Sequence, residues 1–206
     1  MLILCRHGEA QNARGRAIGQ TNLPLSETGR RQALWLAQHV PQGSIATLAA
    51  SPLQRTQHTA QPVAEACGLP ITTIPELAEI NLGTWDGLAF DDIRTRFPAD
   101  YAARGHNIAG FRPPQGESFE DLAARCLPTI TSLAEAKEIT FAVTHAGVIR
   151  VALCMASSLP LEHLFTFRPK HTHCHLLTST QSPFALTLTA TNLPPTALAE
   201  AVAATT

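Results

Sequence analysis

Short apolar runs alternate with segments of helical periodicity, and this alternation limits the folds open to the chain. Leu2–Cys5 is an apolar run ended by Arg6, which is typical of a short, fully buried strand. From Ser26 to about Val40, apolar residues recur at helical spacing, and a Pro and a Gly follow. Strands separated by helices predict an α/β fold, here a three-layer α/β/α sandwich with a mostly parallel central sheet.

The same pattern continues to the end of the chain. Further strands are expected at 46–50, 71–74, 139–144, 172–180 and 185–191, and helices at 51–67, 91–97, 100–104, from 118 onward, 146–157 and after 195. Ser51 is expected as a helix N-cap with Pro52 after it, and Pro128 is expected to kink or interrupt its helix. No repeat or low-complexity linker divides the sequence. We therefore expect one domain over 1–206, with a variable substrate-side lid at about 86–117.

The overall charge excludes a dedicated nucleic-acid binder. The chain has 15 basic and 16 acidic residues, a formal net charge of −1, so no cationic field attracts a polyanion. Its five cysteines are odd in number and form no C-x-x-C pair, which favours reduced thiols. No apolar stretch is long enough for a signal peptide or a membrane span. We expect a cytoplasmic protein without a membrane partner.

Several cationic side chains fall at strand ends and helix starts. His7 follows the first strand, and His145 follows the strand at 139–144, so both belong at the carboxyl edge where α/β sheets bind ligands. Arg6 and Asn12 flank His7, while Arg55 lies in the first turn of a helix, where the dipole favours an anion. Two Arg, two His and an Asn at one edge suit a phosphate group.

A histidine in such a pocket can attack phosphorus, provided that the attacking nitrogen is unprotonated. The alkoxide leaving group then needs an acid. Glu79 is the candidate, with Glu76 and Asp86 as competitors and an ordinary surface carboxylate as the alternative.

These residues lie within six ordered motifs that resemble the histidine phosphatase superfamily, also called the phosphoglycerate mutase-like family. The motifs are Arg6-His7-Gly8-Glu9 with Asn12, GQTNLPLSETG (19–29), SPLQRTQHTA (51–60), ELAEINLGTWDG (76–87), PPQGES (113–118) and THAGVIR (144–150). A single R-H-G tripeptide occurs by chance, but six motifs in the family's order are specific. The sequence departs from the family pattern at Cys5, Ala10 and Asn22, and each departure alters a loop or pocket wall without removing a catalytic group.

The resemblance implies a role for each matching residue. His7 is the nucleophile that is transiently phosphorylated, Arg6, Arg55 and His145 bind the transferring phosphoryl group with help from Asn12, and Glu79 is the proton donor. Substrate-side candidates are Gly19, Gln20, Thr21, Glu117 and Ser118, although Ser118 serves equally as a helix cap. Arg104, His106 and Arg112 either meet a second polar group of the substrate or lie on a solvated loop. No metal or organic cofactor is expected.

One histidine run has no place in these motifs. His171, His173 and His175 alternate around Cys174, so on a strand they share one face, and zinc accepts nitrogen and sulfur donors. The resemblance implies no metal there, and no carboxylate that would orient such ligands is adjacent in sequence. A polar, partly exposed strand is the favoured alternative.

The resemblance also favours hydrolysis over phosphoryl transfer. Mutases of the family have a longer, basic insertion between the acid and the second histidine, and here the stretch from Glu79 to His145 is short. The prediction is a phosphomonoester hydrolase, a monomer or homodimer, acting on a small phosphate ester. The segment RTRFPADYAARGHNIAGFRPPQGESF (94–119) resembles α-ribazole and broad-specificity phosphatases, which makes α-ribazole phosphate one candidate substrate. The alternatives are a phosphoglycerate mutase-type transferase and a non-catalytic phosphate-binding module.

Overall fold

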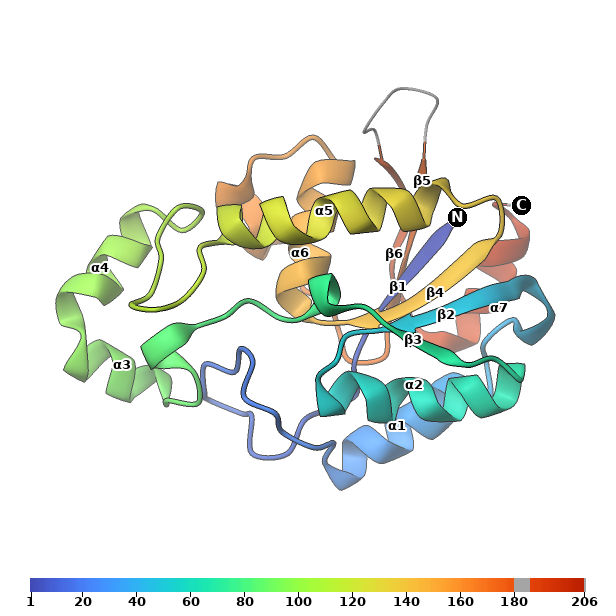
Figure 1. The fold of residues 1–206 in the computed structure, drawn as a ribbon, viewed down its shortest axis with the longest axis horizontal. Coiled ribbons are helices and arrows are strands. Elements are labelled where there is room, and N and C mark those ends of the chain that lie inside the picture. Colours follow the sequence, from blue (N-terminus) through green and yellow to red (C-terminus); the bar gives the residue numbers. More distant parts are fainter. Residues whose placement is uncertain (180–185, 206) are drawn as a thin grey trace.

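Six strands form one sheet in the order β3-β2-β4-β1-β5-β6 in the computed structural model, which describes residues 1–179 and 186–205 (Figure 1). The strands are β1 (Leu2–Arg6), β2 (Ile45–Ala50), β3 (Ile71–Thr73), β4 (Ile139–Thr144), β5 (Cys174–Ser179) and β6 (Leu186–Leu193). The pairs β1–β4, β2–β4 and β2–β3 are parallel, whereas β5 is antiparallel to both of its neighbours. The predicted mostly parallel sheet is confirmed.

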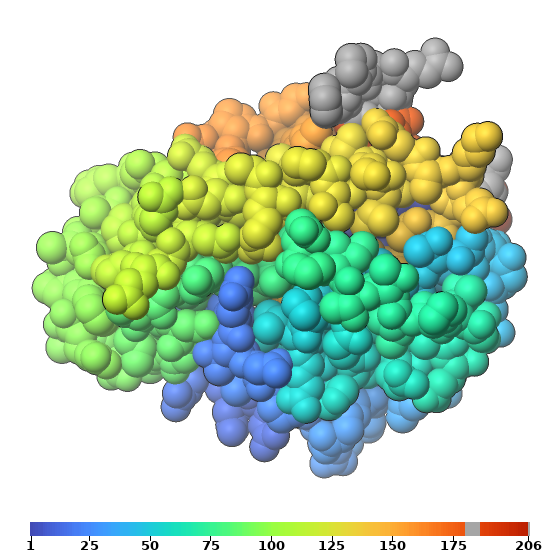
Figure 2. Space-filling view, in the orientation of Figure 1, coloured from blue at the N-terminus to red at the C-terminus, as the bar shows by residue number. Residues whose placement is uncertain are grey.

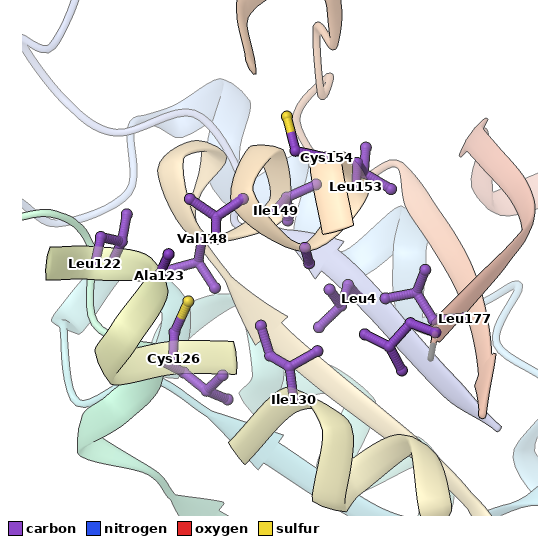
Figure 3. Packing of buried hydrophobic residues seen from close by; sticks show 14 of the residues in the cluster. Leu4, Leu122, Ala123, Cys126, Ile130, Val148, Ile149, Leu153, Cys154 and Leu177 are labelled. Atoms are coloured by element: carbon purple, nitrogen blue, oxygen red, sulfur yellow. The ribbon is translucent and has the colours of Figure 1, made fainter. Parts of the chain in front are cut away.

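Helices cover both faces of the sheet. In Figure 1, α5 (Phe119–Glu135) and α6 (Ala146–Ala156) lie on one face, and α1 (Glu27–Ala37), α2 (Gln54–Cys67) and α7 (Pro195–Ala203) lie on the other. Along β1 the side chains alternate: Leu2 and Leu4 join the core cluster under α5 and α6, while Ile3 and Cys5 join the opposite cluster. Figure 3 shows Leu4 beside Ile130, Ile149 and their neighbours. The three-layer prediction is therefore confirmed.

The predicted lid folds as a small helical unit. Its helices, α3 (Phe90–Arg96) and α4 (Pro98–His106), form the green end of the molecule in Figures 1 and 2. Trp85 and Ile93 pack with Ala17 in a third core cluster. Short 3-10 helices lie before β2 (Gln42–Ser44), after β3 (Pro75–Leu77) and after α6 (Leu161–Thr166). Another, Gly83–Trp85, leads into the lid.

Two local expectations, the capping of α2 by Ser51 and the interruption of α5 at Pro128, are wrong. Ser51 does not cap α2, because the N-cap is Leu53 and the Gln54 N–H donates instead to Asn22 Oδ1 at 2.7 Å. Pro128 does not interrupt α5, which is continuous from Phe119 to Glu135. The carbonyl left without a partner four residues earlier belongs to the exposed Ala124, where water can solvate it.

The last two strands differ slightly from their predicted bounds. β5 begins at Cys174 rather than at Thr172, and Thr180 and Ala185, predicted as strand residues, lie outside the described residues. Across residues 1–179 and 186–205, no helix has both the length and the apolar character that crossing a bilayer requires.

The start of α5 tests one of the substrate-side alternatives. Ser118 Oγ accepts from the Asp121 N–H at 3.1 Å, and an Asp121 carboxylate oxygen accepts from the Ser118 N–H at 2.8 Å, which completes a capping box. Ser118→Ala is expected to lower the free energy of unfolding by about 1 kcal/mol, measured by urea denaturation. The exposed Ser44→Ala variant should change it by less than about 0.5 kcal/mol. Equal values for the two variants would contradict a structural role for the Ser118 hydroxyl.

Candidate active site

The parallel pairing of β1 with β4 brings the two predicted histidines together. Arg6 and Thr144 are register partners at the ends of these strands, and the His7 N–H donates to the Thr144 carbonyl at 3.0 Å. His145 is the N-cap of α6, and its ring centroid lies 5.1 Å from that of His7. Both residues therefore lie at the carboxyl edge of the sheet, as the sequence predicted.

The hydrogen bonds of His7 define its tautomer. Nδ1 lies 2.6 Å from the Gly8 carbonyl oxygen, which can only accept, so Nδ1 holds the proton. Nε2 accepts from Arg55 Nε at 3.3 Å. Burial, together with the positive charges of Arg55 and Arg6, holds the pKa of His7 well below its usual value. The neutral imidazole thus presents an unprotonated Nε2 at neutral pH.

Arg55 is fixed by carbonyl groups rather than by carboxylates. It is 1% exposed, and its Nη1 and Nη2 donate to the carbonyls of Thr21 and Gly19 at 2.9 and 2.7 Å. The loop that supplies these carbonyls is itself held by Asp86, whose carboxylate accepts from the N–H groups of residues 19, 20 and 21. The predicted substrate-side residues Gly19, Gln20 and Thr21 therefore contact Arg55 and Asp86.

Arg6 has a similar environment. Its Nη1 donates to the Pro169 carbonyl at 2.8 Å, and its buried Nε has no hydrogen-bond partner within the described chain. Burial lowers the pKa of Arg6 to about 10, which leaves the guanidinium charged at neutral pH. Two guanidinium groups beside His7 are thus available to an incoming anion.

The carboxyl of Glu79 is buried and anchored to the start of α6. Oε1 accepts from the Ile80 N–H at 3.0 Å, and Oε2 accepts from the Gly147 N–H at 3.1 Å. A Cβ at position 147 would overlap Oε1, so only glycine permits this approach. The competing carboxylates differ in position: Glu76 is exposed and Asp86 is bound by the 19–21 loop.

Ser51 is a site residue that the sequence analysis missed. Its Oγ lies 2.7 Å from His145 Nε2, while His145 Nδ1 is buried without a partner in the described residues. Burial and the nearby Arg55, His7 and Arg6 hold the pKa of His145 well below its usual value. If the Ser51 hydroxyl donates to Nε2, the neutral His145 retains its proton on Nδ1, as a donor.

A cavity of about 920 Å³ opens onto His7 and the groups around it, but its lining does not include His145, Ser51 or the predicted substrate-side residues Gly19, Gln20 and Thr21. Its lining includes Arg6, His7, Asn12, Arg55, Glu79 and His171, and the aromatic residues Trp85, Phe90, Tyr101, Phe119 and Phe165. Arg104 also lines it, whereas His106, Arg112, Glu117 and Ser118 do not. Glu117 is instead paired with Arg125 at 2.9 Å, and Arg112 with Asp121 at 2.6 Å.

The histidine run at 171–175 does not form the expected single face. His171 and Thr172 lie in a turn before β5, where Thr172 has a φ of 56°, so strand alternation does not apply to them. His171 Nδ1 contacts the His7 carbonyl, whereas His175 Nδ1 contacts Thr191 Oγ1. Within 1–179 and 186–205, no group of three or more His, Cys, Asp or Glu is placed to hold a metal ion.

Comparisons with known proteins agree with this geometry. The family model of the histidine phosphatase superfamily (branch 1) matches residues 2–192. The chain is 36% identical over 155 residues to 6-phosphofructo-2-kinase/fructose-2,6-bisphosphatase 1 of Bos taurus, a match covering 74% of this chain and 31% of that protein. It thus spans about a third of that relative's length. It is 35% identical over 160 residues to a Yersinia pestis protein named "Probable phosphoglycerate mutase GpmB", covering 76% and 74% of the two chains.

A solved structure gives the same result. The α-ribazole phosphatase from Shigella flexneri superposes with a TM-score of 0.83 at 29% identity, covering 93% of this chain and 95% of that one. The chain therefore belongs to the histidine phosphatase superfamily.

The buried histidines predict a loss of stability in acid. The folded-state pKa values of His7, His145 and His175 all lie below the usual 6.5, and that of His175 is about 4. At a pH between the folded-state and unfolded-state pKa values, the unfolded chain therefore binds more protons than the folded chain. The free energy of unfolding should therefore fall as the pH drops from about 6.5 to about 4, by about 1.4 kcal/mol per pH unit for each such histidine.

His175→Gln isolates one of these contributions. Urea denaturation at several pH values should show a shallower dependence in this variant than in the wild type, because one titrating group is removed. The exposed His163→Gln variant is the control and should keep the wild-type slope. A His175→Gln slope equal to the wild-type slope would contradict the assignment.

Proposed function

We propose that this chain is a phosphomonoester hydrolase that acts on a small phosphorylated metabolite through a phosphohistidine at His7. The observation that supports it most directly is the tautomer of His7, since Nδ1 donates to the Gly8 carbonyl and Nε2 keeps its lone pair. A phosphoryl group offers Arg55 a stronger acceptor than Nε2, which releases that lone pair for attack.

The proposed reaction has two steps that use side chains lining one cavity. First, His7 Nε2 forms a bond to phosphorus while the ester P–O bond breaks, and Glu79 transfers a proton to the leaving oxygen. Water then attacks phosphorus, Glu79 takes its proton, and the P–N bond breaks to release phosphate and neutral His7. Glu79 thus returns to its protonated form.

The remaining groups stabilise the transferring phosphoryl oxygens by charge or by hydrogen bonds. Arg6 and Arg55 supply fixed positive charge, and His145 offers its Nδ1 as a neutral donor when Ser51 donates to Nε2. Asn12 lines the same cavity and is assigned an assisting role. The proposed steps take place in the cytoplasm, a location consistent with five free cysteines.

The substrate remains within a class of small phosphate esters. The likeness to the Shigella flexneri α-ribazole phosphatase makes α-ribazole phosphate one candidate. The similarity to "Probable phosphoglycerate mutase GpmB" supports a second candidate function, phosphoryl transfer between phosphoglycerates. Phosphate release measured beside 3- to 2-phosphoglycerate conversion distinguishes the two.

A non-catalytic phosphate-binding module is the remaining alternative, and the complete set of His7, Arg55 and Glu79 argues against it.

Removing the nucleophile should abolish turnover. His7→Ala is expected to lower kcat/KM for p-nitrophenyl phosphate by at least about a thousandfold, because no phosphohistidine can form. Acid-quenched wild-type protein should retain label from a ³²P-labelled phosphate ester, and His7→Ala should not. The exposed His58→Ala variant serves as the control. Label on His7→Ala equal to that on the wild type would refute the assignment.

The role of Glu79 depends on the leaving group. Glu79→Gln should lower kcat for an alkyl phosphate by about 10²–10⁴-fold, because an alkoxide needs a proton to leave. The loss should be much smaller for p-nitrophenyl phosphate, since nitrophenolate leaves without one. Glu76→Gln changes an exposed carboxylate nearby and is the matched control. Equal losses for both substrates would show that Glu79 does not protonate the leaving oxygen.

A further inference from the structure

A second space of about 740 Å³ lies beside the catalytic cavity, and its lining is strongly basic. We call it the basic groove; it is lined by Arg6, Gln32, Arg150, Phe165, Arg168, Pro169, Lys170, His171 and His173. Four of these residues, Arg6, Arg150, Phe165 and His171, also line the catalytic cavity, so the two spaces adjoin. None of the carboxylates in residues 1–179 and 186–205 lines the groove.

The cations of the groove form no ion pair in the described part of the chain. None of the ion pairs found there includes Arg6, Arg150, Arg168 or Lys170. The Arg150 Nε donates to the Phe167 carbonyl, and its guanidinium lies 4.9 Å from the ring centroid of Phe165. The buried Arg6 Nε, which lies where the two spaces adjoin, has no hydrogen-bond partner among the described residues. The Glu79 carboxylate acts on Arg6 and Arg150, whereas Arg168 and Lys170 form no ion pair among the described residues. This excess of positive charge favours binding of an anion.

The segment that supplies Arg168 and Lys170 is held in place from two sides. On one side, Arg6 Nη1 donates to the Pro169 carbonyl at 2.8 Å, which links this segment to the phosphate-binding arginine. On the other, Asn192 Oδ1 accepts from the Lys170 N–H at 3.0 Å, and Asn192 Nδ2 donates to the Arg168 carbonyl at 2.9 Å. A segment fixed in this way loses little conformational freedom when a ligand binds.

We propose that the basic groove binds a second anionic group, a phosphate or a carboxylate, on the same substrate molecule whose phosphoryl group reacts at His7. This inference rests on the proposed function for the position of the reacting phosphoryl group. The shared Arg6 and His171 place the two anion sites next to each other, which favours one dianionic ligand over two separate ions. The enzyme then prefers esters that contain two separated anionic groups.

The test compares alkanediol bisphosphates of increasing chain length with the alkyl monophosphates of equal length. The wild type should show a kcat/KM ratio of bisphosphate to monophosphate of at least about ten at the best length, a difference of about 1.4 kcal/mol. The double variant Arg168→Gln/Lys170→Gln should lower that ratio to near one. Lys137 is an exposed lysine that precedes β4, at the end of that strand far from His145, and it forms no ion pair among the described residues. The Lys137→Gln variant should keep the wild-type ratio.

A binding measurement separates this inference from the proposed reaction. Calorimetry with the His7→Ala protein should show tighter binding of the bisphosphate than of the monophosphate, and the added Arg168→Gln/Lys170→Gln changes should remove that preference. An inactive wild type that retains this binding preference would refute hydrolysis but support the groove. A wild type that hydrolyses both esters equally, or a preference that survives the double change, would overturn the groove assignment.

Discussion

The parallel pairing of β1 with β4 is the constraint on which the site depends. Its register sets Arg6 opposite Thr144, and the residues that follow, His7 and His145, then emerge together at the carboxyl edge. A slip of one residue would turn every side chain of β1 to the other face. Both faces are buried in core clusters, so the packing of Leu4 on one side and Ile3 on the other fixes the position of His7.

Arg6 and Arg55 are both held by backbone carbonyls, and no ion pair among the described residues includes either of them. Arg55 contacts backbone carbonyls, which orient a guanidinium without neutralising it. A carboxylate in those positions would form a buried ion pair and compete with a phosphate for the same donors. Asp86 is held by amide groups of the 19–21 loop, and Glu79 by the N–H groups of Ile80 and Gly147. The cationic charge therefore remains available.

Local patterns predicted most of the fold, because periodicity and strand ends are properties of short segments. They located β1, β4 and the histidines that follow them. Such patterns cannot predict contacts between residues far apart in the sequence. Ser51 contacts His145, 94 positions away, and Asn22 accepts a hydrogen bond from the first residue of α2 from a separate loop. The run at 171–175 reads as a strand, yet the left-handed backbone of Thr172 places its first half in a turn. Tertiary contacts, not local sequence preference, determine these positions.

The lid is connected to the catalytic edge through a small core of its own. Trp85 and Ile93 pack with Ala17, so the lid rests on the loop that follows His7 rather than on the central sheet. Residues from this region, among them Tyr101 and Phe90, form one wall of the cavity that His7 and Arg55 also line. The two core clusters on the faces of the sheet contain no residue of α3 or α4. Side chains in this wall of the cavity can therefore change without altering the strands that fix His7 and His145. Under the proposed function, the fold thus separates the groups that would bind the leaving group from those that would act at phosphorus.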